Sequence, residues 1–183
     1  MSVIEERLRP VWAQWCGVIP VWAARKAGVR ADNLRRWAKG NEDVDHVERG
    51  VYAWYPDDVD DTDMDWNMMV PATAVALGGE DAYLWGPSVL EAARLGTIGG
   101  GAVCVAVPKR RRKRNGISWV VTDRKADSTV RGIPSQSLRD AVYSSAGEID
   151  EDKYSEALAD ALSQGIITET EYGDLKQRYC AYA

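Results

Sequence analysis

Between residues 30 and 39 the chain gathers side chains that can bond to nucleic acid on or beside one predicted helix. They are Arg30, Asn33, Arg35, Arg36 and Lys39. An arginine can bond O6 and N7 of guanine together, and an asparagine can bond adenine in the same bidentate way. We therefore expect Arg36 and Asn33 to face base edges and the other three cations to meet phosphates, which position a protein without specifying sequence. The alternative is a protein-docking helix whose arginines are merely solvated.

Two more charged residues belong to the same region. Arg49 falls at the predicted tip of a hairpin, where it can enter a minor groove, touch a phosphate or stay in solvent. Asp32 lies near the start of the predicted helix. It repels phosphate, so its simplest role is to stabilise the positive helix N-terminus. Together these residues predict contact with duplex DNA.

A second group of cations is an uninterrupted run between two predicted strands. The run is Lys109, Arg110, Arg111, Arg112, Lys113 and Arg114. Against phosphates, six contacts at about 0.9 each give a log–log salt slope of roughly −5. The same run also suits a solvated hairpin loop, or a grip for an acidic protein partner.

The remaining candidates for chemistry are weak, and we predict no catalytic residue, no metal site and no cofactor. His46 is the only histidine and has no nucleophile patterned around it. Asp123 and Lys125 follow a predicted strand, as in half of a metal-dependent nuclease site, but the preceding strand carries no second carboxylate. Residues 57–65 lack the glycine and terminal glutamate of a calcium loop. A metal-dependent nuclease stays a minor alternative.

The elements that must position the first group of cations follow from local patterns. Leu34, Trp37 and Ala38 share one face of a helix, which leaves the cations outside. Gly28 supplies the turn before that helix. The expected elements are a helix over residues 3–15 that is kinked at Pro10 or starts afresh near it, a helix over 20–27, a helix over 31–39, and hairpin strands at 44–47 and 51–55. This order is typical of a winged helix-turn-helix.

We predict an α+β protein with two domains joined by an acidic linker. Residues 1–56 form the winged helix-turn-helix, residues 57–65 the linker, and residues 66–183 a mixed domain of helices and a small sheet. Six aspartates in the nine linker residues repel one another and disfavour a core. The second domain is expected to contain strands at 102–107 and 117–122 and helices at 70–77, 88–95, 135–144, 152–163 and 169–179.

Composition limits the class of protein. The net charge is −5, and from residue 140 onward ten acidic residues stand against three basic ones, so any nucleic-acid surface must be local. Cys16, Cys104 and Cys180 form no CxxC pair and are expected to be buried thiols. With no signal peptide and no apolar run long enough to span a membrane, we expect a cytoplasmic protein.

Several segments taken in order resemble the AbiEi family of antitoxins, the transcriptional regulators of bacterial abortive-infection toxin–antitoxin pairs. The N-terminal segments are AARKAGVRADNLRRWAKG and VERGVYAWYP. The later segments are AYLWGPSVLEAARLG, PKRRRKRNG, GIPSQSLRDAV and ALADALSQGIIT. The similarity spans nearly the whole chain, and the order of the motifs is more specific than any one of them.

The resemblance implies a non-enzymatic protein that binds repeats in its own promoter, represses its operon and counteracts a cognate nucleotidyltransferase toxin. Operator symmetry favours two copies per site. The DNA-contacting positions that it implies are Arg30, Asn33, Arg35, Arg36 and Arg49. The family commonly places Ser or Thr at the start of the recognition helix, where this chain has Arg30 and Ala31. The alternative is a module that neutralises its partner by direct contact without binding DNA.

Overall fold

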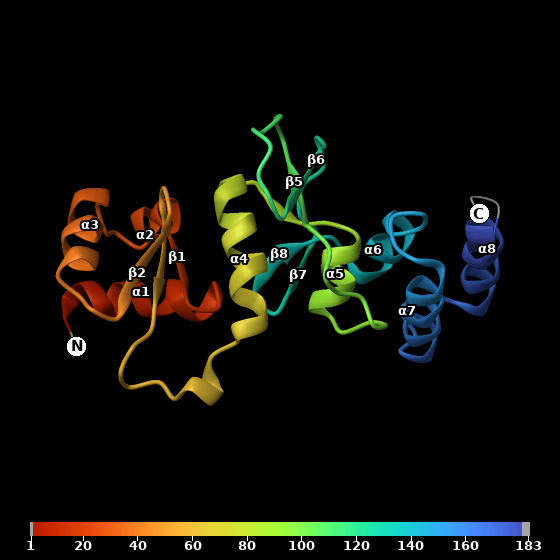
Figure 1. The fold of residues 1–183 in the computed structure, drawn as a ribbon, viewed down its shortest axis with the longest axis horizontal. Coiled ribbons are helices and arrows are strands. Elements are labelled where there is room, and N and C mark those ends of the chain that lie inside the picture. The colour runs from red at the N-terminus through yellow and green to blue at the C-terminus, as the bar shows by residue number, and fades with distance from the viewer. Residues whose placement is uncertain (1, 181–183) are drawn as a thin grey trace. The chain divides into compact units, whose positions relative to one another are not determined.

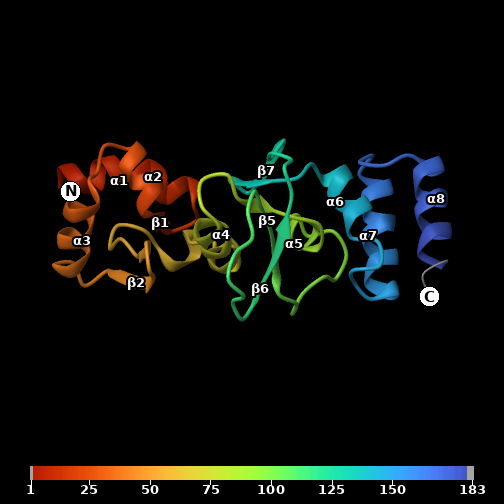
Figure 2. The ribbon, with the colours of Figure 1, turned by 90° about the horizontal axis from the view of Figure 1, so that it is seen from above.

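The computed structural model describes residues 2–180, which form a mixed α/β fold of eight α-helices and two β-sheets. The chain divides into two compact units, Met1–Glu80 and Asp81–Ala183, here called unit 1 and unit 2. Figures 1 and 2 show the elements of each. Among the described residues no helix is both long and apolar enough to cross a membrane.

Unit 1 combines helices with a three-stranded antiparallel sheet of order β1-β3-β2. Its elements are α1 (Val3–Gln14), β1 (Val18–Pro20), α2 (Val21–Lys26), α3 (Ala31–Lys39), β2 (Val44–Glu48), β3 (Val51–Trp54), a 3-10 turn (Asp61–Asp63) and α4 (Trp66–Gly78). The bounds predicted for the helix over residues 31–39 are confirmed, and so is the hairpin. Strand β1 was not predicted, and Pro20 ends it instead of opening the following helix.

The predicted domain boundary and linker are wrong. The helix α4 belongs to unit 1, where the indole Nε1 of Trp22 donates to the carbonyl oxygen of Ala76 at 3.3 Å and Lys26 pairs with Glu80. Arg9 pairs with Asp58 at 2.5 Å, which ties the aspartate-rich segment to α1. The segment is therefore part of unit 1, and the cation on α1 offsets part of its mutual repulsion.

Unit 2 contains a five-stranded mixed sheet of order β6-β5-β4-β8-β7, followed by three helices. Its elements are β4 (Tyr83–Leu84), α5 (Pro87–Ala92), β5 (Val103–Val107), β6 (Ile117–Val121), β7 (Ser128–Val130), β8 (Ile133–Ser135), α6 (Leu138–Ser144), α7 (Glu151–Ser163) and α8 (Glu169–Cys180). The core includes fully buried Leu84, Val105 and Ile133 of the sheet and Tyr154 of α7.

The strands β5 and β6 are parallel, so residues 109–114 do not form the hairpin loop that the sequence suggested for them. Val103 pairs with Ile117, and Val107 pairs with Val121. After β5, the chain must therefore return to the opposite end of the sheet before β6 begins. This return is held in place because the indole Nε1 of Trp119 donates to the backbone oxygen of Arg112 at 2.9 Å.

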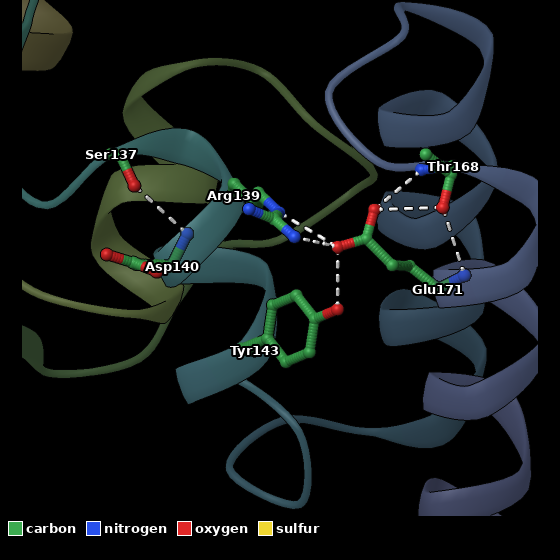
Figure 3. A network of polar contacts seen from close by, with 6 residues as sticks. All are labelled: Ser137, Arg139, Asp140, Tyr143, Thr168 and Glu171. Carbon is green, nitrogen blue, oxygen red and sulfur yellow. Dashed lines mark hydrogen bonds and ion pairs between the residues drawn. The ribbon is translucent and has the colours of Figure 1, made fainter.

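A polar cluster joins α6 to the start of α8 in unit 2 (Figure 3). The carboxylate of Glu171 accepts hydrogen bonds from Arg139 Nε at 2.8 Å and from the Tyr143 hydroxyl at 2.9 Å. Its other oxygen accepts from the backbone N–H of Thr168 at 2.9 Å, while the Thr168 hydroxyl accepts from the Glu171 N–H. This reciprocal pair is a capping box that starts α8. The Thr168 N–H first, and then Arg139 and Tyr143, lower the pKa of Glu171 to about 2.

The cysteines differ in part from the prediction of buried thiols. Cys16 and Cys104 are half-buried. Burial is the main cause that raises the pKa of the Cys104 thiol. The side chain of Cys180 lies outside the described residues.

Candidate nucleic-acid interface

The helix α3 presents one apolar and one cationic face. Leu34 is fully buried and Ala38 nearly so, whereas Arg35, Arg36 and Lys39 are exposed. This division follows from the 3.6-residue period, because residues three and four apart lie on the same face. The apolar face fixes the helix in unit 1, and the cations stay available to a partner.

Aromatic packing holds α3 against the rest of unit 1. The Trp37 ring meets the Trp54 ring of β3 edge to face, with centroids 5.3 Å apart, and Trp12 of α1 meets Trp54 at 6.5 Å. The Trp37 indole also donates to the carboxylate of Glu5 at 3.3 Å. The backbone N–H of Ser2, aided by this indole, lowers the pKa of Glu5. Helices α1 and α3 are thus positioned by packing and by a charged acceptor.

A groove of about 600 Å³ lies between α3 and the β2–β3 hairpin. Three of the predicted site residues line it: Arg35 and Lys39 from α3, and Arg49 from the hairpin turn. All three side chains are exposed. The structure therefore brings together cations that lie up to 14 positions apart in the sequence.

The hairpin adds two residues to the groove that were not predicted as site residues, His46 and Tyr52. They are cross-strand partners whose ring centroids lie 5.0 Å apart. His46 is exposed. The two-residue alternation along β2 carries the signal, because Val44 and His46 share a face and both line the groove.

The two residues expected to face base edges are bonded to each other. The Nη2 atom of Arg36 donates to Oδ1 of Asn33 at 2.7 Å, one turn apart on α3. Neither residue lines the groove. This bond and a longer one from Nε of Arg36 to the backbone oxygen of Asp32, at 3.5 Å, hold the guanidinium close to the helix surface and leave the remaining Nη hydrogens for a partner.

Arg30 belongs neither to the groove residues nor to the Arg36–Asn33 pair. It occupies the N-cap position of α3. Within the described chain this helix start has no side-chain cap, as the residues Arg30 and Ala31 imply. The exposed Asp32 in the first turn stabilises the positive helix end by its charge instead.

The second run of cations belongs to unit 2 and is presented by the return between β5 and β6. Residues 109–113 are exposed and Arg114 is half-buried.

Asp123 and Lys125, the weak nuclease candidates, are exposed in the segment after β6. Within residues 2–180, no three His, Cys, Asp or Glu side chains gather in a way that could hold a metal ion.

No protein-family model matches this chain, and no curated protein matches it closely enough to count as a relative. Among solved structures, it is similar to the crystal structure of the RV2827C protein from Mycobacterium tuberculosis. The two share 12% identity over 99% of this chain and 72% of the other, with a TM-score of 0.47. A likeness of this size says nothing about function, and no family assignment follows from it.

Proposed function

We propose that the chain binds duplex DNA through unit 1, with α3 in the major groove and the β2–β3 hairpin along the adjacent backbone. The observation that carries the proposal is the cationic groove formed by Arg35, Lys39 and Arg49. Residues 1–80 hold nine Lys or Arg against fourteen Asp or Glu, yet residues 25–49 hold seven of those nine cations and only five of the acidic residues. A local positive surface on a negative unit favours one docking orientation on a polyanion.

The interpretation of unit 1 as a winged helix-turn-helix is supported by its order of elements. Helix α1, strand β1, helices α2 and α3, and the hairpin β2–β3 follow one another, and the three strands form one antiparallel sheet. In this interpretation α3 is the recognition helix and Arg49 lies in the wing. Arg35, Lys39 and Arg49 then meet phosphates, while Arg36 and Asn33 face base edges.

The biological role that we propose is that of an AbiEi-type antitoxin, and it rests on the sequence resemblance. The protein represses its own operon from repeats in the promoter and counteracts a nucleotidyltransferase toxin encoded beside it. It acts in the cytoplasm, without chemistry or cofactor of its own. Two copies occupy each operator.

The direct test is the mobility of the DNA upstream of the gene in the presence of the protein. The wild type is expected to prefer this DNA over an unrelated duplex of equal length. Arg36→Ala should reduce that preference by about 1–3 kcal/mol, the value of one bidentate base contact. Arg25→Ala on α2 removes the same charge from the same unit and is the matched control. If wild-type protein shows no preference for the upstream DNA, repression of its own operon is wrong.

A second experiment separates the proposal from a module that acts only by protein contact. The protein is co-expressed with the neighbouring toxin gene, and growth is measured together with the output of the native promoter. The Arg35→Gln/Lys39→Gln variant should no longer repress the native promoter, so the output of that promoter should rise. If this variant represses as well as the wild type, DNA binding by α3 is refuted, whatever happens to growth.

A further inference from the structure

Cations from two separate segments of unit 2 meet at one end of its sheet. Because β5 and β6 are parallel, their carboxyl ends lie side by side, and the N–H of Thr122 donates to the oxygen of Val107 at 3.0 Å. Lys109 and Arg110 follow β5, and Arg124 and Lys125 follow β6. A hairpin would have placed these two pairs at opposite ends of the strands.

The charge in this region is nearly all of one sign. Residues 108–127 carry eight Lys or Arg against only Asp123 and Asp127. Lys109, Arg110 and Lys113 are exposed, and so are Arg124 and Lys125. We call Lys109 and Arg110 together with Arg124 and Lys125 the basic sheet end; residues 111–114 continue the positive charge back along the sheet toward the start of β6. The excess is local, since residues 140–183 of the same unit carry ten acidic and three basic residues.

The cationic return is anchored to the sheet through its backbone. The Trp119 indole donates to the backbone oxygen of Arg112, and Arg114 forms an antiparallel bridge with Ile117. Neither contact uses the charged head of a side chain. The backbone of the segment is thus held at two points while Lys109, Arg110 and Lys113 stay exposed, so ordering the segment costs less on binding than in a free loop.

We infer that the basic sheet end is a second DNA contact, which binds the phosphate backbone without regard to sequence. Duplex DNA is favoured over an acidic protein because the four cations gathered at one end of the sheet, continued by residues 111–114, match a regular line of phosphates. Each such contact also releases condensed counterions, a gain that isolated carboxylates do not offer. This inference rests on the proposed function for its choice of duplex DNA and adds a contact outside unit 1.

The test compares two variants of the full chain that lose the same charge from unit 2. Lys109→Gln/Arg110→Gln/Lys125→Gln changes the basic sheet end, and Lys153→Gln/Lys176→Gln/Arg178→Gln changes α7 and α8. Affinity for a fluorescent 30-base-pair duplex of unrelated sequence is measured by anisotropy from about 50 to 200 mM salt, a range that resolves such contacts. Circular dichroism melting checks that both variants fold.

The basic-end variant should lower the magnitude of the log–log slope by about 2.7, and the control should leave it unchanged. Equal slopes in the two variants overturn the inference. Tighter binding of labelled polyglutamate than of the duplex also overturns it, in favour of an acidic protein partner. Measuring the Arg35→Gln/Lys39→Gln variant in the same assay distinguishes a failure of this inference from a failure of the proposed role of α3. If binding ignores that change but depends on the basic sheet end, the proposed role of α3 fails while the inference stands.

Discussion

The groove of unit 1 makes a quantitative prediction for DNA binding. Arg35 and Lys39 line it from one helix and are one turn apart, so both can meet the same stretch of backbone. If each neutralises one phosphate, Arg35→Gln/Lys39→Gln lowers the magnitude of the log–log salt slope by about 1.8. From 50 to 200 mM salt, the wild type should then lose affinity about 12-fold more than the variant does.

The matched control is Arg25→Gln/Lys26→Gln on α2. It removes two charges from the same unit, both outside the groove, and Lys26 is already paired with Glu80. Anisotropy titrations of both variants on the upstream DNA, at four or more salt concentrations, give the slopes directly. A slope that falls equally in the two variants would show that unit 1 responds only to its net charge. The assignment of phosphate contacts to the groove would then be refuted.

Two further predictions concern unit 2. Glu171→Gln keeps a capping residue but loses the charge that Arg139 and Tyr143 face. Because the folded pKa is lowered from 4.5 to about 2, this stabilisation is present above pH 4.5 and is lost as the pH falls to 2. The melting-temperature difference from the wild type should shrink over that window; Glu169→Gln is the control, and a pH-independent difference would contradict the assignment. Gly96→Ala should cost about 1–3 kcal/mol for the backbone alone, since φ is +66°. It also places a Cβ 2.8 Å from the backbone nitrogen of Ala157, whereas Gly101→Ala meets nothing within 4 Å; equal stability of the two in urea denaturation would refute this account.

The helix α3 and its hairpin could be predicted because their signals are local. Leu34, Trp37 and Ala38 mark one helical face, and Gly28 marks the turn before it through its positive φ of 81°. Both patterns need only a few neighbouring residues. The exposure of the α3 cations was predictable as well, because the same helical period places them away from the apolar face.

Features that depend on distant partners were not predictable in the same way. The strand β1 has three residues, and its pairing with β3 joins Val18 to Ala53 across 35 positions of sequence. The groove needs Arg49 and His46 to come beside α3, which the packing of Trp37 on Trp54 determines. The residue pattern within a single helix or strand carries no information about such contacts.

The direction of β6 shows where a general rule failed. Two strands joined by a short connection usually form an antiparallel hairpin, and residues 108–116 are few for a crossover. Here the return packs against Trp119 and closes with the bridge at Arg114, so the parallel arrangement is stabilised by its own connection. The cations at 109–114 were visible in the sequence, but the meeting of Lys109 and Arg110 with Arg124 and Lys125 became visible only in three dimensions.

The opposite charges of unit 2 are separated in space, with β5 and β6 on one side and α7 and α8 on the other (Figures 1 and 2). Such a unit has a large permanent dipole moment. In the field of a polyanion it experiences a torque before any contact forms, which turns the sheet end inward and the helices outward. The rotation acts over roughly one Debye length, about 8–10 Å near physiological salt. An encounter with DNA would thus leave the acidic helices α7 and α8 facing solvent, where a second, basic macromolecule can reach them.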